Sequence, residues 1–427
     1  MPFEIIRDPL WNNVRVEPFA MRLIDTAAFQ RLRYVRQLGL AYLVYPGATH
    51  SRFEHAVGAY HLARRTLTLL AEREPSLDPI DGAIARAAML LHDVGHYPFS
   101  HALEEIGAPH HEEVARPLVT GGEIADVLSA TLGPDAPARV VALIRGTSDS
   151  PLQGLVAGSL DLDKIEYLKR DAFMCGVPYG EIDVDRLLHS MVLVPDPASG
   201  RPTVGVLEKG LAALESLLFA KYQMYRNVYW HHAVRSATAM YKRLVADALD
   251  SGTVDVATLT RLTDDTLLAH LDSSFASSSS SASSSSSLLH ALRARHLYKR
   301  ALECPAAELA DRAPEWIATD WRLTVAAENR LAQDLGLHPG ELLLDFPAKT
   351  QMLELDLPVR RRDGAVRRLS DGGWEGAINL PSLSAELYGS ARWLRVFVAR
   401  PVTIARDTML ATLARPADDV RRWLNHG

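Results

Sequence analysis

The stretch Leu90–His101, LLHDVGHYPFSH, decides how the sequence is interpreted, because it places three histidines and one aspartate within twelve residues. His92 and Asp93 are adjacent at the end of an apolar run, and His96 and His101 follow one and two turns later. A buried histidine is usually a satisfied core residue, and an aspartate beside it would normally lie at the surface. A metal ion that binds both side chains would explain why this pair is held inside.

Two further segments contain groups that bind metals. The first is residues 45–55, YPGATHSRFEH, and the second is residues 159–171, SLDLDKIEYLKRD. Their candidate ligands are His50, His55, Asp161 and Asp163. Imidazoles and carboxylates form a mixed set that suits Mn, Fe, Mg or Zn and leaves room for water or a substrate oxygen. A single His-Asp pair is frequent by chance, so it is the combination of three segments that indicates a site.

The composition is that of an ordinary globular protein. Of the 427 residues, 48% are hydrophobic and 23% charged, which allows one large domain with a smaller appendage, or two to three domains. The start, MPFEIIRDPLW, lacks the apolar segment of a signal peptide, and no apolar run approaches the roughly 18–20 residues of a membrane span. Only Cys175 and Cys304 are present, which argues against disulfides and a cysteine-ligated zinc. We therefore expect a cytoplasmic protein with no membrane partner.

Charge is unevenly distributed along the chain. The net charge of −6 disfavours indiscriminate binding to a nucleic acid backbone. Residues 359–369, VRRRDGAVRRL, nevertheless hold five arginines against one aspartate. Such a patch suits a small anionic ligand better than a long polyanion, and the alternative is a solvated face without a ligand.

The first 250 residues are predicted to be largely helical. Residues 59–73 and 81–92 carry apolar side chains at helical spacing, and residues 211–249 predict one long helix or two joined in line. Residues 195–202, PDPASGRP, are typical of the turn of a short hairpin. The nearly pure serine segment 273–287 cannot bury apolar area, so we expect a flexible loop there.

The pattern changes toward the C-terminus. Residues 393–399, WLRVFVA, alternate as a strand does. Asp363-Gly364 is a hairpin turn signal between arginine-flanked arms. We therefore predict a mainly α protein with a helical core at 1–250, a helical connector at 251–310 and a smaller mixed α+β lobe at 311–427.

The order of the motifs, H…HD…D, with the three quoted segments and residues 24–39, IDTAAFQRLRYVRQLG, resembles the HD-domain superfamily of metal-dependent phosphohydrolases. Within it, residues 5–249 are most similar to deoxynucleoside triphosphate triphosphohydrolases (dNTPases). The resemblance implies an HD-domain helical core and one divalent ion, Mn, Mg or Fe, without an organic cofactor. It assigns that ion to His55, His92, Asp93 and Asp163.

The resemblance also implies a reaction in which water attacks the α-phosphorus of a dNTP and the 5′ oxygen departs. The departing alkoxide needs a proton, and imidazole is the natural general acid because its pKa is near neutrality. The resemblance places His96, His101 and His111 in the active site, with Glu112 beside His111 and with Glu104 where relatives usually have an aspartate. We expect His101 to be the acid and Glu104 to orient it. The alternative for His96 is a surface residue before the next turn.

A triphosphate requires cations. Arg52 lies three residues before His55 on the same helical face and can reach a phosphate on the metal. The resemblance adds Lys164, and it adds Lys221 where relatives have an arginine, which keeps the charge without the bidentate fork.

The deoxyribose has its own expected contacts. The resemblance places Gln37, Tyr167 and Asp171 at the sugar, where Asp171 can accept a hydrogen bond from the 3′-hydroxyl. Tyr229, with Tyr225 one turn before it, is expected to leave no room for a 2′-hydroxyl. The alternative for Tyr225, Tyr229 and Trp230 is helix-core packing.

A second nucleotide site is possible by the same resemblance. In regulated relatives, positions matching Asp25, Gln30 and Arg33 bind an activating guanine nucleotide, and Lys209 matches a phosphate-binding lysine. The alternative is that Asp25 and Arg33 form a structural helix pair. The expected partners are thus the dNTP, an activating nucleotide and further copies of the chain.

Two other functions remain open from the sequence. The same metal site would serve a phosphodiesterase or nucleotidase acting on nucleotides or single-stranded nucleic acid. A catalytically idle scaffold that senses nucleotides is disfavoured because every expected metal position and the histidine set are present.

Overall fold

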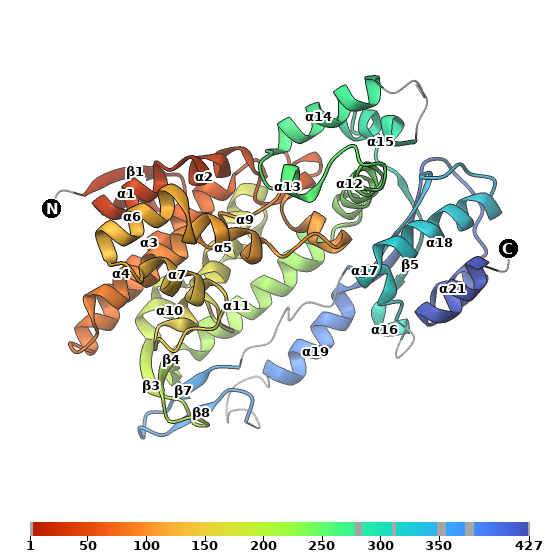
Figure 1. Ribbon diagram of the computed structural model, residues 1–427. Coiled ribbons are helices and arrows are strands. Elements are labelled where there is room, and N and C mark those ends of the chain that lie inside the picture. The colour runs from red at the N-terminus through yellow and green to blue at the C-terminus, as the bar shows by residue number, and fades with distance from the viewer. Residues whose placement is uncertain (1–2, 278–283, 310–312, 348–355, 372–379, 426–427) are drawn as a thin grey trace.

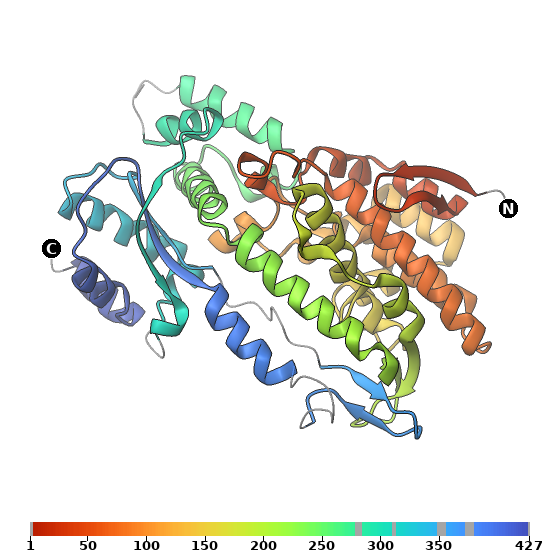
Figure 2. The same cartoon turned by 180° about the vertical axis from the view of Figure 1, so that it is seen from behind.

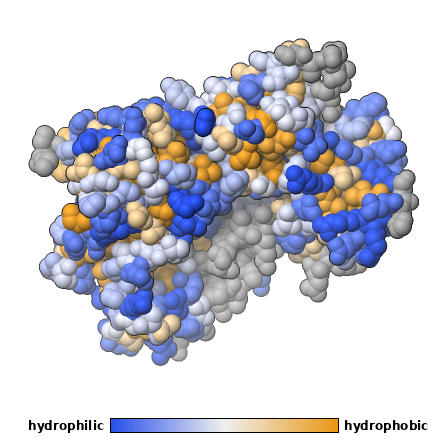
Figure 3. Space-filling model, in the orientation of Figure 1, coloured by the Kyte–Doolittle hydropathy of each residue, from blue (hydrophilic) through white to orange (hydrophobic). Residues whose placement is uncertain are grey.

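The structure is a computed structural model that describes residues 3–277, 284–309, 313–347, 356–371 and 380–425. Helices dominate, as predicted, and small sheets accompany them (Figure 1). A large helical body contains the N-terminus, and a smaller lobe contains the C-terminus at the far end of the molecule. The face seen in Figure 3 is largely hydrophilic, with hydrophobic residues gathered near α13 (Val256–Leu259) and on the C-terminal lobe. Within the described ranges, no single helix is long and apolar enough to cross a membrane. α6 (Gly122–Leu132) and α7 (Ala136–Ile144) meet that test only as a pair bent by 111°.

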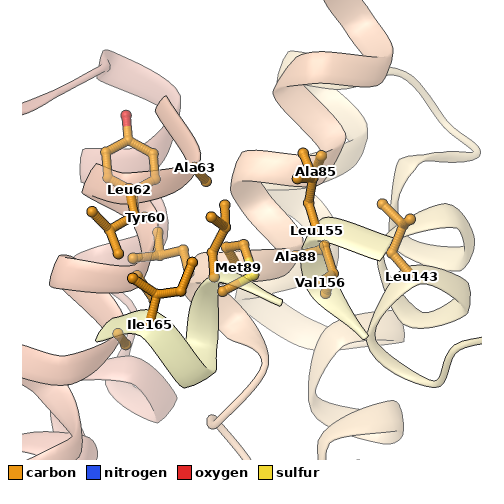
Figure 4. Packing of buried hydrophobic residues seen from close by; sticks show 14 of the residues in the cluster. Tyr60, Leu62, Ala63, Ala85, Ala88, Met89, Leu143, Leu155, Val156 and Ile165 are labelled. Carbon is orange, nitrogen blue, oxygen red and sulfur yellow. The ribbon is translucent and has the colours of Figure 1, made fainter. Parts of the chain in front are cut away.

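Three helices form the centre of the helical body: α3 (Arg52–Arg73), α4 (Pro79–Leu91) and α9 (Leu162–Cys175). α3 begins with a capping box of Ser51 and Glu54, and α4 begins with Asp78 as N-cap and a proline at its first position. Their apolar faces meet in the core shown in Figure 4, where Leu62, Met89 and Ile165 come from the three different helices. The helices predicted at 59–73 and 81–92 are therefore confirmed, and α4 ends one residue before the His92-Asp93 pair.

Shorter elements surround this centre. They are β1 (Glu4–Asp8), β2 (Asn12–Val16), α1 (Pro18–Ile24), α2 (Ala27–Gln30), η1 (Arg31–Tyr34), η2 (Gly39–Leu43), η3 (Ser100–Ile106), α5 (His111–Thr120), α6 (Gly122–Leu132), α7 (Ala136–Ile144), α8 (Gln153–Val156), η4 (Pro178–Gly180), α10 (Val184–Ser190), β3 (Met191–Pro195), β4 (Pro202–Leu207) and η5 (Glu208–Gly210). β3 and β4 pair antiparallel across the predicted turn at 195–202.

Residues 211–250 form two helices rather than one. α11 (Leu211–Met224) runs into a π-helical turn, η6 (Tyr225–Tyr229), and α12 (His232–Asp250) follows. Figure 1 shows α12 almost end-on, whereas α11 runs across the view, so the two are not in line as expected. The π-helical turn and the break after it change the direction of the chain.

A second core lies beside α12, where α14 (Asp264–Ser277) and α15 (Ser284–Arg293) pack through leucines such as Leu244, Leu267 and Leu288. The prediction of a loop at 273–287 is wrong for residues 273–277 and 284–287, which belong to α14 and α15. Residues 278–283 lie outside the described residues. Leucines anchor the helices, and this tertiary packing outweighs the weak helix preference of serine.

The C-terminal lobe contains an antiparallel sheet of order β5-β9-β6, made of β5 (Lys299–Pro305), β9 (Trp393–Val398) and β6 (Leu342–Asp345). The strand predicted at 393–399 is thus confirmed. The helices of this lobe are α16 (Ala306–Leu309), α17 (Trp316–Thr319), α18 (Trp321–Asp334), α20 (Arg406–Leu413) and α21 (Ala417–Asn425).

The predicted arginine hairpin is also present, as β7 (Pro358–Arg360) and β8 (Val366–Arg368), but it does not belong to that sheet. β7 pairs parallel with β4, which gives a second sheet of order β3-β4-β7-β8. α19 (Leu380–Ala391) returns along α11 (Figure 2). Leu357, Val359 and Leu369 are buried in the core of the helical body, so this segment crosses the boundary expected at residue 311.

Candidate active site

Four acidic and imidazole side chains meet where α3, α4 and α9 come together. His55 Nε2 lies 3.2 Å from His92 Nε2 and 3.0 Å from Asp163 Oδ1. The two oxygens of Asp93 lie 3.7 Å from His55 Nε2 and 3.4 Å from His92 Nε2. His55 is on α3, His92 and Asp93 follow α4, and Asp163 is in the first turn of α9, so helix packing brings three distant segments to one point.

Both imidazoles of this cluster present Nε2 to its centre. His55 Nδ1 lies 2.7 Å from Glu166 Oε2, and His92 Nδ1 lies 2.8 Å from the Met89 carbonyl oxygen. Both partners are acceptors, so each Nδ1 keeps its proton, and a cation bound at the centre would take the place of a proton on Nε2. Burial alone would lower the pKa of His55, but its hydrogen bonds to Asp163 and Glu166 raise that pKa to about 10. The converging ligand atoms of His55, His92 and Asp163 could therefore hold a divalent ion. Asp93 lies beside this group, and its carboxylate is paired with Arg52.

Glu166 contacts His55, and the sequence interpretation did not single it out. Besides His55, it accepts hydrogen bonds from Trp11 Nε1 at 2.8 Å and Arg170 Nε at 2.7 Å. Arg170 in turn lies 3.0 Å from Asp8. The signal was present in the quoted segment, because Glu166 and Arg170 are spaced i, i+4 on the helix that carries Asp163.

Two of the initial ligand candidates lie elsewhere. Asp161 caps α9, accepting from the Lys164 backbone N–H at 2.9 Å, and pairs with the Lys164 ammonium group. His50 Nε2 lies 2.8 Å from Asp171 Oδ1. Neither side chain belongs to the group of converging ligand atoms.

Arg52 is buried against the cluster. Its guanidinium pairs with Asp93, and its Nε donates to Ser100 Oγ at 3.1 Å. Burial would raise the pKa of Asp93, but Arg52 and His92 hold it well below its usual range. Asp93 is therefore ionised and Arg52 is fixed in place.

A second group of histidines lies beside the first. The rings of His96 and His111 stack with centroids 3.8 Å apart, and the centroid of His101 is 4.6 Å from that of His96. Glu104 joins two of them, with Oε1 2.8 Å from His111 Nδ1 and Oε2 3.3 Å from His101 Nδ1. Burial lowers the pKa of His96 far below its usual value and that of His111 to about 4. His96 is fully buried rather than a surface residue, and His101 is the exposed member.

Two adjoining cavities, of about 560 and 600 Å³, open over these groups. Glu112 lines the first cavity, and burial raises the pKa of its carboxyl. Lys221 lines the second cavity. The residues that line both are Gln37, Arg52, His101, Asp163, Lys164 and Tyr167. A ligand that spans the two cavities would therefore contact the candidate metal ligands with one end and the second cavity with the other.

The second cavity carries the expected sugar residues. Tyr229 Oη donates to Asp171 Oδ2 at 2.7 Å, and its ring lies 5.0 Å from that of Tyr225 and 6.3 Å from that of Tyr167. These side chains line the cavity in addition to packing on one another, and so does Trp230. The π-helical turn orients this aromatic group.

The residues expected at a regulatory site are less closely grouped. Arg33 Nε donates to Gln30 Oε1 at 2.8 Å, and the guanidinium lies 3.4 Å from the Phe53 ring centroid. Asp25 is exposed on the same surface, and no ion pair joins it to Arg33 among the described residues. Lys209 is exposed in η5, directly after β4, whereas Gln30 and Arg33 lie on α2 and η1.

Known proteins are similar to this chain in sequence and in fold. Residues 52–151 match the HD domain, and residues 182–372 match the HD associated region. The uncharacterised protein MJ1154 of Methanocaldococcus jannaschii is 30% identical over 371 residues, covering 86% of this chain and 74% of that protein. The deoxynucleoside triphosphate triphosphohydrolase SAMHD1 homolog of Dictyostelium discoideum is 28% identical, covering 69% of this chain and 59% of its own length. A phosphohydrolase structure from Bacteroides thetaiotaomicron has a TM-score of 0.72 at 21% identity, covering 93% of this chain and all of the other.

Fold and ligand cluster together define a hydrolase of the HD class, with a site for a divalent metal ion. More particularly, the chain belongs to the HD-domain family of dNTPase-like phosphohydrolases. It spans little more than half the length of the curated dNTPases that it matches.

Proposed function

We propose that the protein hydrolyses dNTPs to the deoxynucleoside and inorganic triphosphate. The observation that carries this proposal is the set of three cations, Arg52, Lys164 and Lys221, around cavities that adjoin the metal ligands. A phosphate monoester or diester would not need so many positive charges, whereas a triphosphate pairs with all three.

The metal ligands are His55, His92, Asp93 and Asp163. A bound Mn, Mg or Fe ion supplies positive charge that polarises the α-phosphate and makes water a stronger nucleophile. The protein orients the substrate around that position. Arg52 reaches the phosphates from the wall of both cavities, and Lys164 and Lys221 approach from α9 and α11.

His101 donates the proton to the departing 5′ oxygen. It is the exposed member of the histidine group, and Glu104 holds its Nδ1, which leaves Nε2 for the proton transfer. His96 and His111 are neutral because burial lowers their pKa, so they pack around the acid without adding charge. Glu112 completes this wall of the cavity.

The sugar occupies the second cavity in this proposal. Asp171 accepts the 3′-hydroxyl, and Gln37 and Tyr167 line the passage between the cavities. Tyr229 is fixed by its hydrogen bond to Asp171 and packs against Tyr225. In this position its ring would leave no room for a 2′-hydroxyl.

Regulation by a second nucleotide is a further part of the proposal. Asp25 and Arg33 are exposed near Gln30, and Lys209 is exposed on a separate surface. Such positions suit a nucleotide bound between copies of the chain, which makes the protein a homo-oligomer in this proposal.

One observation favours a second candidate function, a phosphodiesterase or nucleotidase. Ligand atoms of His96, His101, Glu104 and His111 lie within 4.8 Å of one another and could hold another cation. Pairs of metal ions are common in enzymes that cleave phosphodiesters.

A product assay separates the two. Metal-stripped protein is supplied with Mn or Mg and each dNTP or NTP, alone and with GTP, and products are resolved by ion exchange. The proposal is supported if the wild type forms deoxynucleoside and intact triphosphate and the H92A/D93A variant forms neither. Faster turnover with GTP supports the regulatory site. Monophosphate with pyrophosphate, or no turnover of any dNTP, overturns it.

A further inference from the structure

The loop before α3, residues 45–51, is tied to the second cavity at both of its ends. The Tyr45 hydroxyl donates to the carbonyl oxygen of Asn227, inside the π-helical turn that carries Tyr229. At the other end, the His50 carbonyl accepts from the Gln37 backbone N–H at 3.0 Å. The side chain of His50 contacts Asp171 on α9. One short loop thus touches three parts of the cavity wall.

The contacts of Asp171 form a buried chain of three side chains. His50 Nε2 lies 2.8 Å from one carboxylate oxygen, and Tyr229 Oη donates to the other at 2.7 Å. The His50 and Asp171 side chains are only 1% and 2% exposed. Burial raises the pKa of Tyr229 well above its usual value, so its hydroxyl stays a donor. Each carboxylate oxygen retains a lone pair, so Asp171 can still accept from a ligand.

The rest of the His50 ring has no polar role within the described residues. Its Nδ1 is buried without a hydrogen-bond partner. Ala41 and Val234, which form a small apolar cluster with Ala48, line the same cavity. The only polar contact of the His50 ring among the described residues is therefore Asp171, so His50 can affect the site by holding the Asp171 carboxylate in place.

We propose that His50 is a positioning residue for the sugar subsite, holding Asp171 toward the 3′-hydroxyl and, through Asp171, fixing the Tyr229 ring against the 2′ position. This inference rests on the proposed dNTP hydrolysis. His50 lies outside the metal-ligand cluster, so its loss affects sugar recognition without removing a ligand.

The test compares kcat/KM for the best dNTP, its 2′,3′-dideoxy analogue and its ribonucleotide. H50A should lower kcat/KM for the dNTP about 10- to 100-fold, since a hydrogen bond to a charged group is lost. The dideoxy analogue has no 3′-hydroxyl, so its kcat/KM should fall much less, and discrimination against the ribonucleotide should weaken. Bound Mn should stay as in the wild type.

Conservative variants make the test independent of folding. The amide nitrogen of H50Q reaches the Nε2 position and should restore sugar selectivity, whereas the shorter H50N should not. H270A is the matched control and should behave as the wild type, because it removes a half-buried histidine whose side chain hydrogen-bonds, among the described residues, to the Thr253 carbonyl alone. Equal losses on dNTP and dideoxy analogue, with H50Q no better than H50N, would overturn the positioning role alone. A wild type that hydrolyses no dNTP would overturn the proposed function, and the inference with it.

Discussion

Gly58 gives the sharpest test of how the metal ligands are held. It lies one turn after His55 on α3, and the carboxylate of Glu166 occupies the space beside it. A Cβ at position 58 would lie 2.0 Å from Glu166 Oε1 and 2.7 Å from Arg170 Nη2. G58A must therefore displace the carboxylate that holds His55 Nδ1.

Two opposing effects set the change in stability that G58A causes. Alanine is favoured over glycine within a helix by about 0.5–1 kcal/mol. Overpacking costs about 1–3 kcal/mol, so the metal-free variant should be less stable than the wild type by about 0.5–2 kcal/mol. Losing the partner of a ligating histidine lowers metal affinity about 10- to 100-fold, which equals about 1.4–2.7 kcal/mol.

Calorimetric titration with Mn and urea unfolding of the metal-free protein measure the two effects. G82A is the matched control, because Gly82 is also buried in a helix but a Cβ there meets only Arg86 Nη1 at 3.4 Å. G82A should bind Mn as the wild type does and be slightly more stable. The reasoning is refuted if G58A binds Mn as tightly as G82A and unfolds at the same urea concentration.

Three other predictions concern pH, metal and the buried charges. Burial and the nearby Lys164 lower the pKa of Lys221 to about 8, so its positive charge is lost as the pH rises through 8. The value of kcat/KM should therefore fall above pH 8, and in K221R this decrease should occur at higher pH. Mn at about 100 times its Kd should stabilise the protein by about 2.7 kcal/mol over chelator-treated protein, and an unchanged Tm would contradict the metal site. Arg235 lies 2.5 Å from buried Asp345, so D345N should lower the free energy of unfolding, measured in urea, by about 3–5 kcal/mol. R201A breaks an exposed ion pair and should change that free energy by no more than about 0.5 kcal/mol, so similar losses in the two variants would contradict the prediction.

Local features were predictable because they depend on neighbours in sequence. Helical spacing predicted α3 and α4, alternation predicted β9, and Asp363-Gly364 predicted the arginine hairpin, where Gly364 adopts a φ of 90°. The serine segment misled because leucines outside it anchor the two helices on α12. The direction of α12 depended on a π-helical turn that has no simple sequence signal.

The sequence by itself determined the chemistry that is available: adjacent His92 and Asp93 at a helix end, and histidines and aspartates in two further segments. Only the tertiary structure decided which of them converge, because packing of α3, α4 and α9 brings His55 and Asp163 together and directs His50 and Asp161 to other partners. It also decided that Glu166 orients His55 and that residues 356–371 and α19 return to the helical body. Such contacts join residues far apart in the chain, and their distances depend on how whole helices and strands pack.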